Sequence, residues 1–150
     1  MNSRAPASSQ NLINRARECL QQGDLDGAEV AFVEVLATAP RHPGALHTLG
    51  LIAQKRGDLA RATKLLQSAA ESAPDSPEIQ SHLGEALRAQ GKAAEAVAAG
   101  RRATKLAPDW PPGLNNLGLA LQEAGELDEA EATYRRLVEI APDYPRGHYN

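Results

Sequence analysis

The apolar side chains of this sequence recur at spacings of three and four residues, in short stretches separated by glycine or proline. Residues 43–56 predict one amphipathic helix and residues 59–73 a second. Their apolar stripes are Leu46, Leu49, Gly50 and Ala53, and then Leu59, Ala62, Leu65, Leu66 and Ala69. Proline suits the first position of a helix and glycine the left-handed residue that closes one, so Pro43 and Gly57 bound the first helix. We also expect the small residues Gly50 and Ala62 to let the two helices approach closely.

The same pattern returns every 34 residues, which predicts a stacked array of small helical units rather than a single globular core. Many positions carry the period, among them Pro40, Pro74, Pro108 and Pro142; Gly23, Gly57, Gly91 and Gly125; Ala28, Ala62, Ala96 and Ala130; and Pro43, Pro77, Pro111 and Pro145. We therefore predict an all-α solenoid of antiparallel helix pairs, with units at residues 9–42, 43–76, 77–110 and 111–144. Residues 1–8 are predicted to be a flexible tail. Residues 145–150 open a fifth unit, so we expect the sequence to be part of a longer array or protein.

These units resemble the tetratricopeptide repeat. The family pattern has a large residue, Leu-Gly, a second large residue, then Ala, an aromatic residue and Pro. It is matched by Leu46, Leu49-Gly50, Ala53, Ala62, Leu66 and Pro74, and again by Leu114, Leu117-Gly118, Leu121, Ala130, Tyr134 and Pro142. The resemblance implies a right-handed α-α superhelix in which the first helix of each unit lines a concave groove.

Two units depart from the pattern. The first has Arg15-Ala16 where the others have Leu-Gly, as expected for a terminal repeat with no neighbour on one side. The third has Gly100 where the others have Phe32, Leu66 and Tyr134. A glycine there predicts either a locally soft unit or a gap that a bulky neighbour such as Trp110 or Leu114 fills.

Composition excludes several classes of function. The net charge is −3, with 16 basic and 19 acidic residues, which argues against a nucleic-acid partner. No apolar run approaches the ~20 residues needed to span a bilayer, and no secretory leader is visible. We therefore expect a cytoplasmic protein with no membrane partner.

No catalytic or metal-binding constellation is apparent in the sequence, so we predict no enzyme activity, cofactor or metal. The four histidines, His42, His47, His82 and His148, have no metal-ligand spacing among themselves. Cys19 is the only cysteine and has no activating base nearby in sequence, so we interpret it as a small core residue.

A peptide or partner protein is expected to contact the polar positions on the first helix of each unit. The predicted contacts are Asn14, Arg17, His47, Thr48, Leu51, Lys55, His82, Glu85, Arg88, Asn115, Asn116, Leu119 and Gln122. Asn14, Thr48, His82, Asn116 and Asn150 share one position in the period, which is similar in part to the asparagine-lined superhelix of O-linked N-acetylglucosamine transferases. The Lys and Asn of the carboxylate clamp of chaperone-binding tetratricopeptide domains have no match, which argues against that role.

Three functions remain open at this point. The first is a scaffold that binds a peptide or protein in the concave groove. The second is the substrate-recognition arm of a larger enzyme, such as a glycosyltransferase or sulfotransferase, with a catalytic domain beyond residue 150. The third is self-assembly, as a homodimer through an uncapped last repeat, by way of Leu127, Ala130, Tyr134, Leu137, Val138 and Tyr149.

Overall fold

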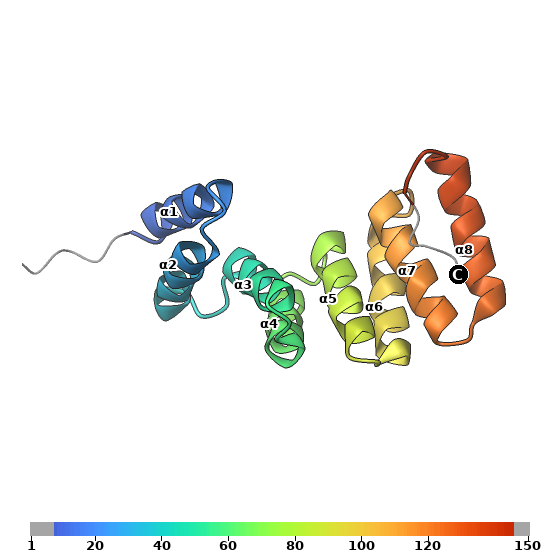
Figure 1. The fold of residues 1–150 in the computed structure, drawn as a ribbon, viewed down its shortest axis with the longest axis horizontal. Helices are drawn as coiled ribbons and strands as arrows, with labels where there is room; N and C mark the ends of the chain where they lie inside the picture. The colour runs from blue at the N-terminus through green and yellow to red at the C-terminus, as the bar shows by residue number, and fades with distance from the viewer. Residues whose placement is uncertain (1–7, 146–150) are drawn as a thin grey trace, which may run out of the picture. The chain divides into compact units, whose positions relative to one another are not determined.

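The computed structural model describes residues 8–145, and this part of the chain consists of helices and short turns (Figure 1). Unit 1, which ends at Ser72, contains α1 (Ser9–Gln21), α2 (Leu25–Thr38), α3 (Pro43–Lys55) and α4 (Leu59–Ser72). Unit 2, which begins at Ala73, contains α5 (Pro77–Ala89), α6 (Ala93–Leu106), α7 (Pro111–Glu123) and α8 (Leu127–Ile140). The all-α fold of helix pairs predicted from the 34-residue period is confirmed.

Proline and glycine act in the structure as their positions in the period predict. Pro43, Pro77 and Pro111 begin α3, α5 and α7, where an absent N–H leaves no helical hydrogen bond unmade. The turn inside each pair contains a glycine with a φ between 74° and 80°, at Gly23, Gly57, Gly91 and Gly125. Other residues adopt this left-handed conformation only at a cost, so the glycine column fixes where each pair turns.

Within unit 1, α2 packs against both α1 and α3, and α3 packs against α4. One core cluster joins the first three helices through Leu12, Ala16, Ala31, Phe32, Val35, Ala45 and Leu49. Gly50 lies so close to α4 that a Cβ atom there would be 2.7 Å from Leu66 Cγ and 3.4 Å from the carbonyl oxygen of Ala62. The predicted close approach of α3 and α4 is therefore confirmed.

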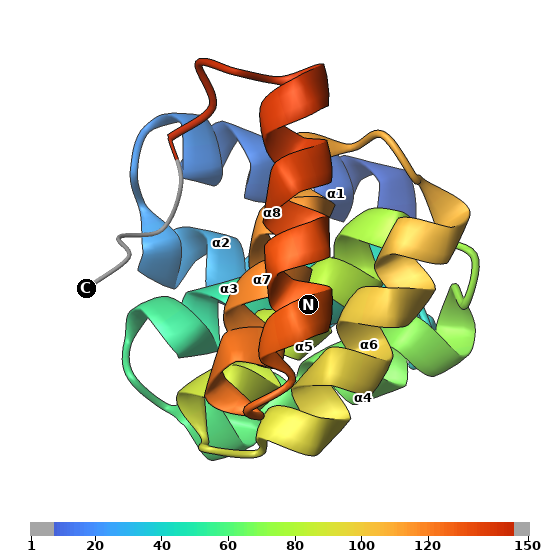
Figure 2. The same cartoon turned by 90° about the vertical axis from the view of Figure 1, so that its right-hand side faces the viewer.

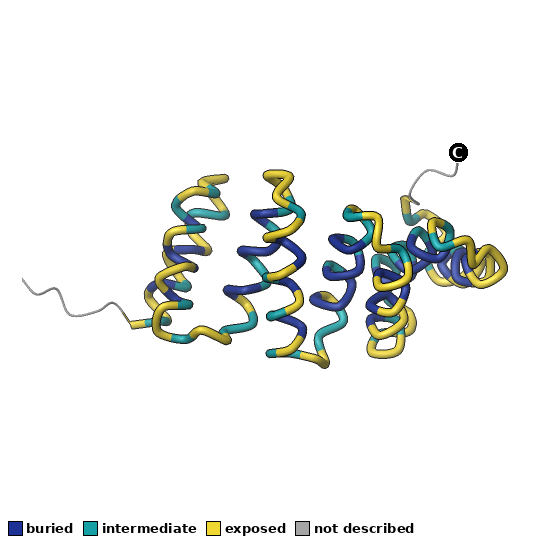
Figure 3. The backbone as a smooth tube through the Cα atoms, turned by 90° about the horizontal axis from the view of Figure 1, so that it is seen from below, coloured by how far each residue is buried: buried dark blue, intermediate teal, exposed yellow. Residues whose placement is uncertain are grey.

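Within unit 2, α7 is the central helix, because it packs against α5, α6 and α8 (Figure 2). Its apolar side chains Leu114, Leu117 and Leu121 are buried. Buried positions of α5 and α7 alternate mostly with half-buried ones, whereas α6 and α8 carry many exposed positions (Figure 3). The polar side of α7 is left for other contacts.

The missing side chain at Gly100 leaves no gap. A Cβ atom on Gly100 would lie 3.0 Å from Leu117 Cδ1 and 3.2 Å from Leu117 Cα, so α7 has moved in against α6. The expectation that Trp110 or Leu114 fills a space there is wrong, because the backbone and side chain of Leu117 occupy it. Trp110 instead lies over Gly113, where a Cβ atom would be 2.8 Å from its ring.

Candidate functional site: the exposed face of α5 and α7

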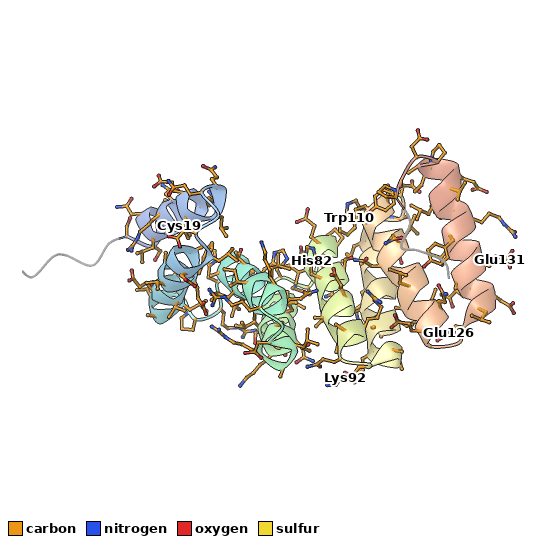
Figure 4. All side chains as sticks on the ribbon, viewed as in Figure 1. Cys19, His82, Lys92, Trp110, Glu126 and Glu131 are labelled. Atoms are coloured by element: carbon orange, nitrogen blue, oxygen red, sulfur yellow. The ribbon has the colours of Figure 1, made fainter. Side chains whose placement is uncertain are left out.

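The predicted contact residues of unit 2 lie on two neighbouring helices and all are partly exposed. His82, Glu85 and Arg88 belong to α5, and Asn115, Asn116, Leu119 and Gln122 belong to α7. We call this set, together with Glu123 of α7, the α5/α7 face. Figure 4 shows His82 on α5 and Trp110 at the start of α7, whereas Lys92 and Glu126 lie in the turns that precede α6 and α8.

A hydrogen bond in the N-terminal half of the two helices holds one predicted residue in place. Asn116 Nδ2 donates to Ser81 Oγ at 2.9 Å. Ser81 is only 1% exposed, so its hydroxyl is a fixed acceptor inside the unit, whereas Asn116 remains half-buried. Ser81 directly precedes His82, the α5 residue that shares the phase of Asn116 in the 34-residue period.

An ion pair crosses the same two helices near their C-terminal ends. Arg88 Nη1 of α5 lies 2.6 Å from Glu123 Oε1 of α7, and both side chains are partly exposed. Exposed pairs of this kind add little to stability, commonly under about 1 kcal/mol. The pair has a larger effect on the charge of the α5/α7 face, because the Glu123 carboxylate offsets the positive charge of Arg88.

Ser81 and Glu123 are not among the predicted contacts, although each lies beside a residue that is. Ser81 precedes His82, and Glu123 follows Gln122. Each is therefore one residue away from a predicted contact on the same helix. Only the packing of α5 against α7 shows that Ser81 bonds to Asn116 and Glu123 to Arg88.

In unit 1 the predicted contact residues lie on α1 and α3, and all are at least partly exposed: Asn14, Arg17, His47, Thr48, Leu51 and Lys55. Two of them form hydrogen bonds within their own helix. Asn14 Oδ1 accepts from Gln10 Nε2 at 3.1 Å, and Thr48 Oγ1 donates to the carbonyl oxygen of Gly44 at 2.9 Å. Asn150, the last member of the predicted ladder, lies outside the described residues.

The apolar surface expected for self-association is largely buried already. Ala130, Tyr134 and Leu137 are at most 4% exposed, and the Tyr134 ring packs on α7, where a Cβ atom on Gly118 would be 2.6 Å from its Cζ. These three residues therefore present no uncovered surface, which corrects that expectation. Leu127 is 62% exposed and Val138 half-buried, while Tyr149 lies outside the described residues. Self-association through the remaining residues stays a prediction.

Two clusters of ion pairs lie at the turns, away from the α5/α7 face. In unit 2, Arg101 of α6 binds Glu126 and Glu129 at 2.5 Å each. Hydrogen bonds from Arg101 lower the pKa of the Glu129 carboxyl below its usual value, and Glu129 in turn raises the pKa of the guanidinium. These pairs connect one helix pair with the next and have no part in the candidate site.

In unit 1, Glu29 of α2 accepts bonds from Arg61, at 2.6 Å, and from Arg56, which also pairs with Asp26. The hydrogen bond from Arg61 is the largest of the effects that lower the pKa of Glu29. This cluster joins α2 to α4 and to the turn before it, as the Arg101 cluster joins α6 to α8.

A cleft of about 490 Å³ lies between α6, α7 and α8, on a different side of unit 2 from the predicted residues. Its floor includes Leu114 and Leu117, and its rim includes Arg135 and Arg136. Both arginines are paired with acids of the same chain, Arg135 with Glu131 and Arg136 with Asp109. We therefore do not assign a ligand to this cleft.

Among residues 8–145, no group of three or more His, Cys, Asp or Glu side chains could hold a metal ion. None of the described helices is long and apolar enough to cross a membrane. Cys19 is half-buried rather than a full core residue.

The tetratricopeptide repeat family model matches residues 20–86 and 87–149, which together make up most of the chain. The chain belongs to the tetratricopeptide repeat family. Members of this family generally serve as protein-interaction scaffolds, and the fold confirms the family resemblance of the repeats. No match was found among curated proteins.

Several solved structures share the fold. The chain is 31% identical to a mutant of the O-GlcNAc transferase of Thermobaculum terrenum, with a TM-score of 0.71 over 81% of this chain, but it spans only 23% of that protein. It is 28% identical to MamA, with a TM-score of 0.79, over 85% of this chain and 74% of that one. YrrB, described as a tetratricopeptide repeat protein with an unusual peptide-binding site, is 18% identical, with a TM-score of 0.81, over 92% of this chain and 77% of that one. The likeness to YrrB concerns the fold alone.

Proposed function

We propose that the chain is a protein-interaction scaffold that binds an extended peptide segment on the face formed by the first helices of its repeats. The α5/α7 face is its main contact surface in unit 2. The family generally provides interaction surfaces of this kind, and the chain carries polar, partly exposed side chains at the corresponding positions.

The observation that carries the proposal is the orientation of Asn116. One N–H of its amide is engaged by the buried Ser81 hydroxyl, and no other hydrogen bond of this side chain is formed among the described residues. The second N–H and the oxygen atom can therefore serve a ligand. An extended peptide backbone offers one acceptor and one donor per residue, which matches this pair of groups.

The ordering of Asn116 before binding also favours affinity. A side chain that is already held in place loses less conformational entropy when the ligand arrives. Each of the two hydrogen bonds to the ligand contributes on the order of 1 kcal/mol. We therefore expect Asn116→Ala to weaken peptide binding by about tenfold, which corresponds to about 1.4 kcal/mol.

A displayed library of random nonapeptides, selected on the immobilised chain, tests the proposal. Enriched peptides are synthesised, and their affinities are measured by fluorescence anisotropy for the original chain, for Asn116→Ala and for a control, Gln67→Ala. Gln67 is an exposed amide on α4, so its removal should leave binding unchanged. Circular dichroism checks that both variants keep their helix content. The proposal fails if no peptide is enriched, or if Asn116→Ala binds the enriched peptides as tightly as the control does.

A second candidate function is the substrate-recognition arm of a larger transferase. It is favoured by the 31% identity to the O-GlcNAc transferase of Thermobaculum terrenum across 81% of this chain. In that case the peptide bound at Asn116 is the substrate of a catalytic domain encoded beyond residue 150. Sequencing the reading frame downstream of Asn150 decides between the two, because an immediate stop codon would remove the transferase alternative.

A further inference from the structure

We infer that copies of this chain associate through the second helices of their repeats, with α2 of one copy packed antiparallel on α6 of another. The surface on α2, here called the α2 face, comprises Val30, Val33, Glu34 and Ala37. The surface on α6, the α6 face, comprises Ala98, Arg102, Lys105 and Leu106. The inference goes beyond peptide binding and does not depend on it. It is carried by exposed apolar side chains and by the opposite charges of the two faces.

The α2 face is apolar at two positions where the equivalent helices have no large apolar side chain. Val30 and Val33 are 52% and 49% exposed, and they lie one turn apart on the same side of α2. The 34-residue period places Lys64, Ala98 and Ala132 at the position of Val30, and Gln67, Arg101 and Arg135 at that of Val33. Two neighbouring valines that are half exposed favour a partner surface that covers them.

The α2 face also carries an unpaired negative charge. α2 has three acidic side chains and no Lys or Arg, and two of the acids, Asp26 and Glu29, already bind arginines of the same unit. Glu34 is exposed beside Val33 and forms no ion pair within residues 8–145. A partner for this surface therefore combines apolar contact with positive charge.

The α6 face has this combination. Arg102 and Lys105 are exposed and form no ion pair among the described residues, whereas Arg101 binds two acids at the start of α8 and in the turn before it. Leu106 follows Lys105 and is 40% exposed. The two arginines of α8 are both paired with acids of their own chain, so α8 offers no equivalent charge. Charge complementarity thus points to α6 as the partner of α2.

An antiparallel pairing matches the two faces turn by turn. When Glu34 lies opposite Arg102, Val30 lies opposite Leu106, because each pair of positions is four residues apart on its own helix. The methylene groups of Arg102 and of the adjacent lysine then cover Val33. A parallel pairing with the same ion contact would place Val30 opposite an alanine, so the antiparallel register buries more apolar surface.

A second copy of the chain is the occupant, because every copy carries both faces. The contact joins unlike surfaces, so one contact leaves an α2 face and an α6 face open, and association closes into a ring or continues as a chain. Since α6 packs against α5 and α7, its exposed side is turned away from both helices. The α5/α7 face therefore stays accessible, and an assembly would present several peptide sites at once.

Sedimentation velocity of the whole chain at rising concentration tests the association. One helix pair buries less than the ~1,600 Å² of a standard interface, so the contact is weak and the series extends to about 1 mM. We expect the average mass to rise with concentration. Val33→Gln gives α2 the residue type of Gln67, its equivalent in α4, and should lower the association constant about tenfold because a half-exposed valine is no longer buried.

A charge swap identifies the two faces. Glu34→Arg alone and Arg102→Glu alone should both remain monomeric, because each places like charges opposite one another. An equimolar mixture of the two should associate again, because every contact between unlike copies then joins a glutamate and an arginine, and added salt should weaken it. The controls are Glu71→Arg and Lys64→Glu, which make the same charge changes at exposed positions of α4 and should associate like the original chain. Circular dichroism checks the helix content of all variants.

The inference is overturned if the original chain stays monomeric throughout the series, or if the mixture does not associate. It is also overturned if Glu34→Arg and Arg102→Glu still associate singly, or if the α4 controls lose association as well. These outcomes are distinct from failure of the proposed function, because Asn116 belongs to neither face. Asn116→Ala should associate like the original chain, whatever peptide selection finds.

Discussion

Replacing Gly100 with leucine tests how α6 and α7 pack against each other. The other three repeats have Phe32, Leu66 and Tyr134 at this position, and all three are buried. If the glycine left a void, a leucine would fill it. In the structure a Cβ atom at residue 100 would lie 3.2 Å from Leu117 Cα, which is a backbone atom and cannot rotate away.

A void at Gly100 and a packed site there predict changes of opposite sign in the free energy of unfolding of Gly100→Leu. Filling a void with a leucine would stabilise the protein by about 1.5–3 kcal/mol. Replacing a glycine inside a helix would add about 1 kcal/mol of stability through the higher helix propensity of leucine. Inserting a side chain into a site that is already packed costs about 1–3 kcal/mol. Since α7 itself must move to make room, we take the upper end of that cost. After the helix-propensity gain, we expect Gly100→Leu to be destabilised by about 2 kcal/mol.

Urea unfolding followed by Trp110 fluorescence measures the change in unit 2. Trp110 is the only tryptophan and lies against Gly113 at the start of α7, so its emission reports on this helix. The matched control is Ala98→Leu, which adds the same side chain to an exposed position of α6 and should change stability by less than about 0.5 kcal/mol. If Gly100→Leu is more stable than the original chain, the close packing of α6 on α7 is wrong.

Two other substitutions test specific contacts of unit 2. Gly118→Ala should destabilise the protein by about 1 kcal/mol or more despite the higher helix propensity of alanine, because the new methyl group would lie 2.6 Å from the Tyr134 ring; an unchanged urea midpoint would contradict this. Glu129→Gln should reduce the amount of folding stability that the protein loses as the pH is lowered. The pKa of Glu129 is lowered in the folded state by hydrogen bonds from Arg101, so its contribution is present above the ordinary value of 4.5 and is lost as the pH falls through the lowered pKa. Urea midpoints of the two proteins should therefore differ at neutral pH and converge in acid, and a constant difference would count against the assignment.

The helix boundaries were predictable from the sequence because local chemistry sets them. Pro43 predicts the start of a helix and Gly57 its end, and α3 spans Pro43–Lys55 with Gly57 at a φ of 80°. A proline without an N–H and a glycine free to adopt positive φ act through their own backbone, whatever packs around them. The same holds for the family, since its repeat pattern is made of such positions.

The candidate site was predictable only in part. The 34-residue period identified the polar positions on α5 and α7, because residues in phase recur on the same side of successive helices. The period does not indicate which residue of α5 bonds to Asn116. The hydrogen bond to Ser81 is a property of the packed pair, since the offset between two packed helices depends on the side chains between them.

What only the tertiary structure decided is how far apart the helices lie and what covers each apolar side chain. From the sequence, Gly100 indicated a soft unit or a gap, and Tyr134 and Leu137 indicated an uncovered end. In the structure α7 closes on Gly100 and also buries Tyr134 beside Gly118. The position of a residue in the repeat determines which side of its own helix it occupies, and this depends on that helix alone. The distance to the next helix is set jointly by every side chain in the contact, so that a glycine can as readily draw two helices together as leave a space between them.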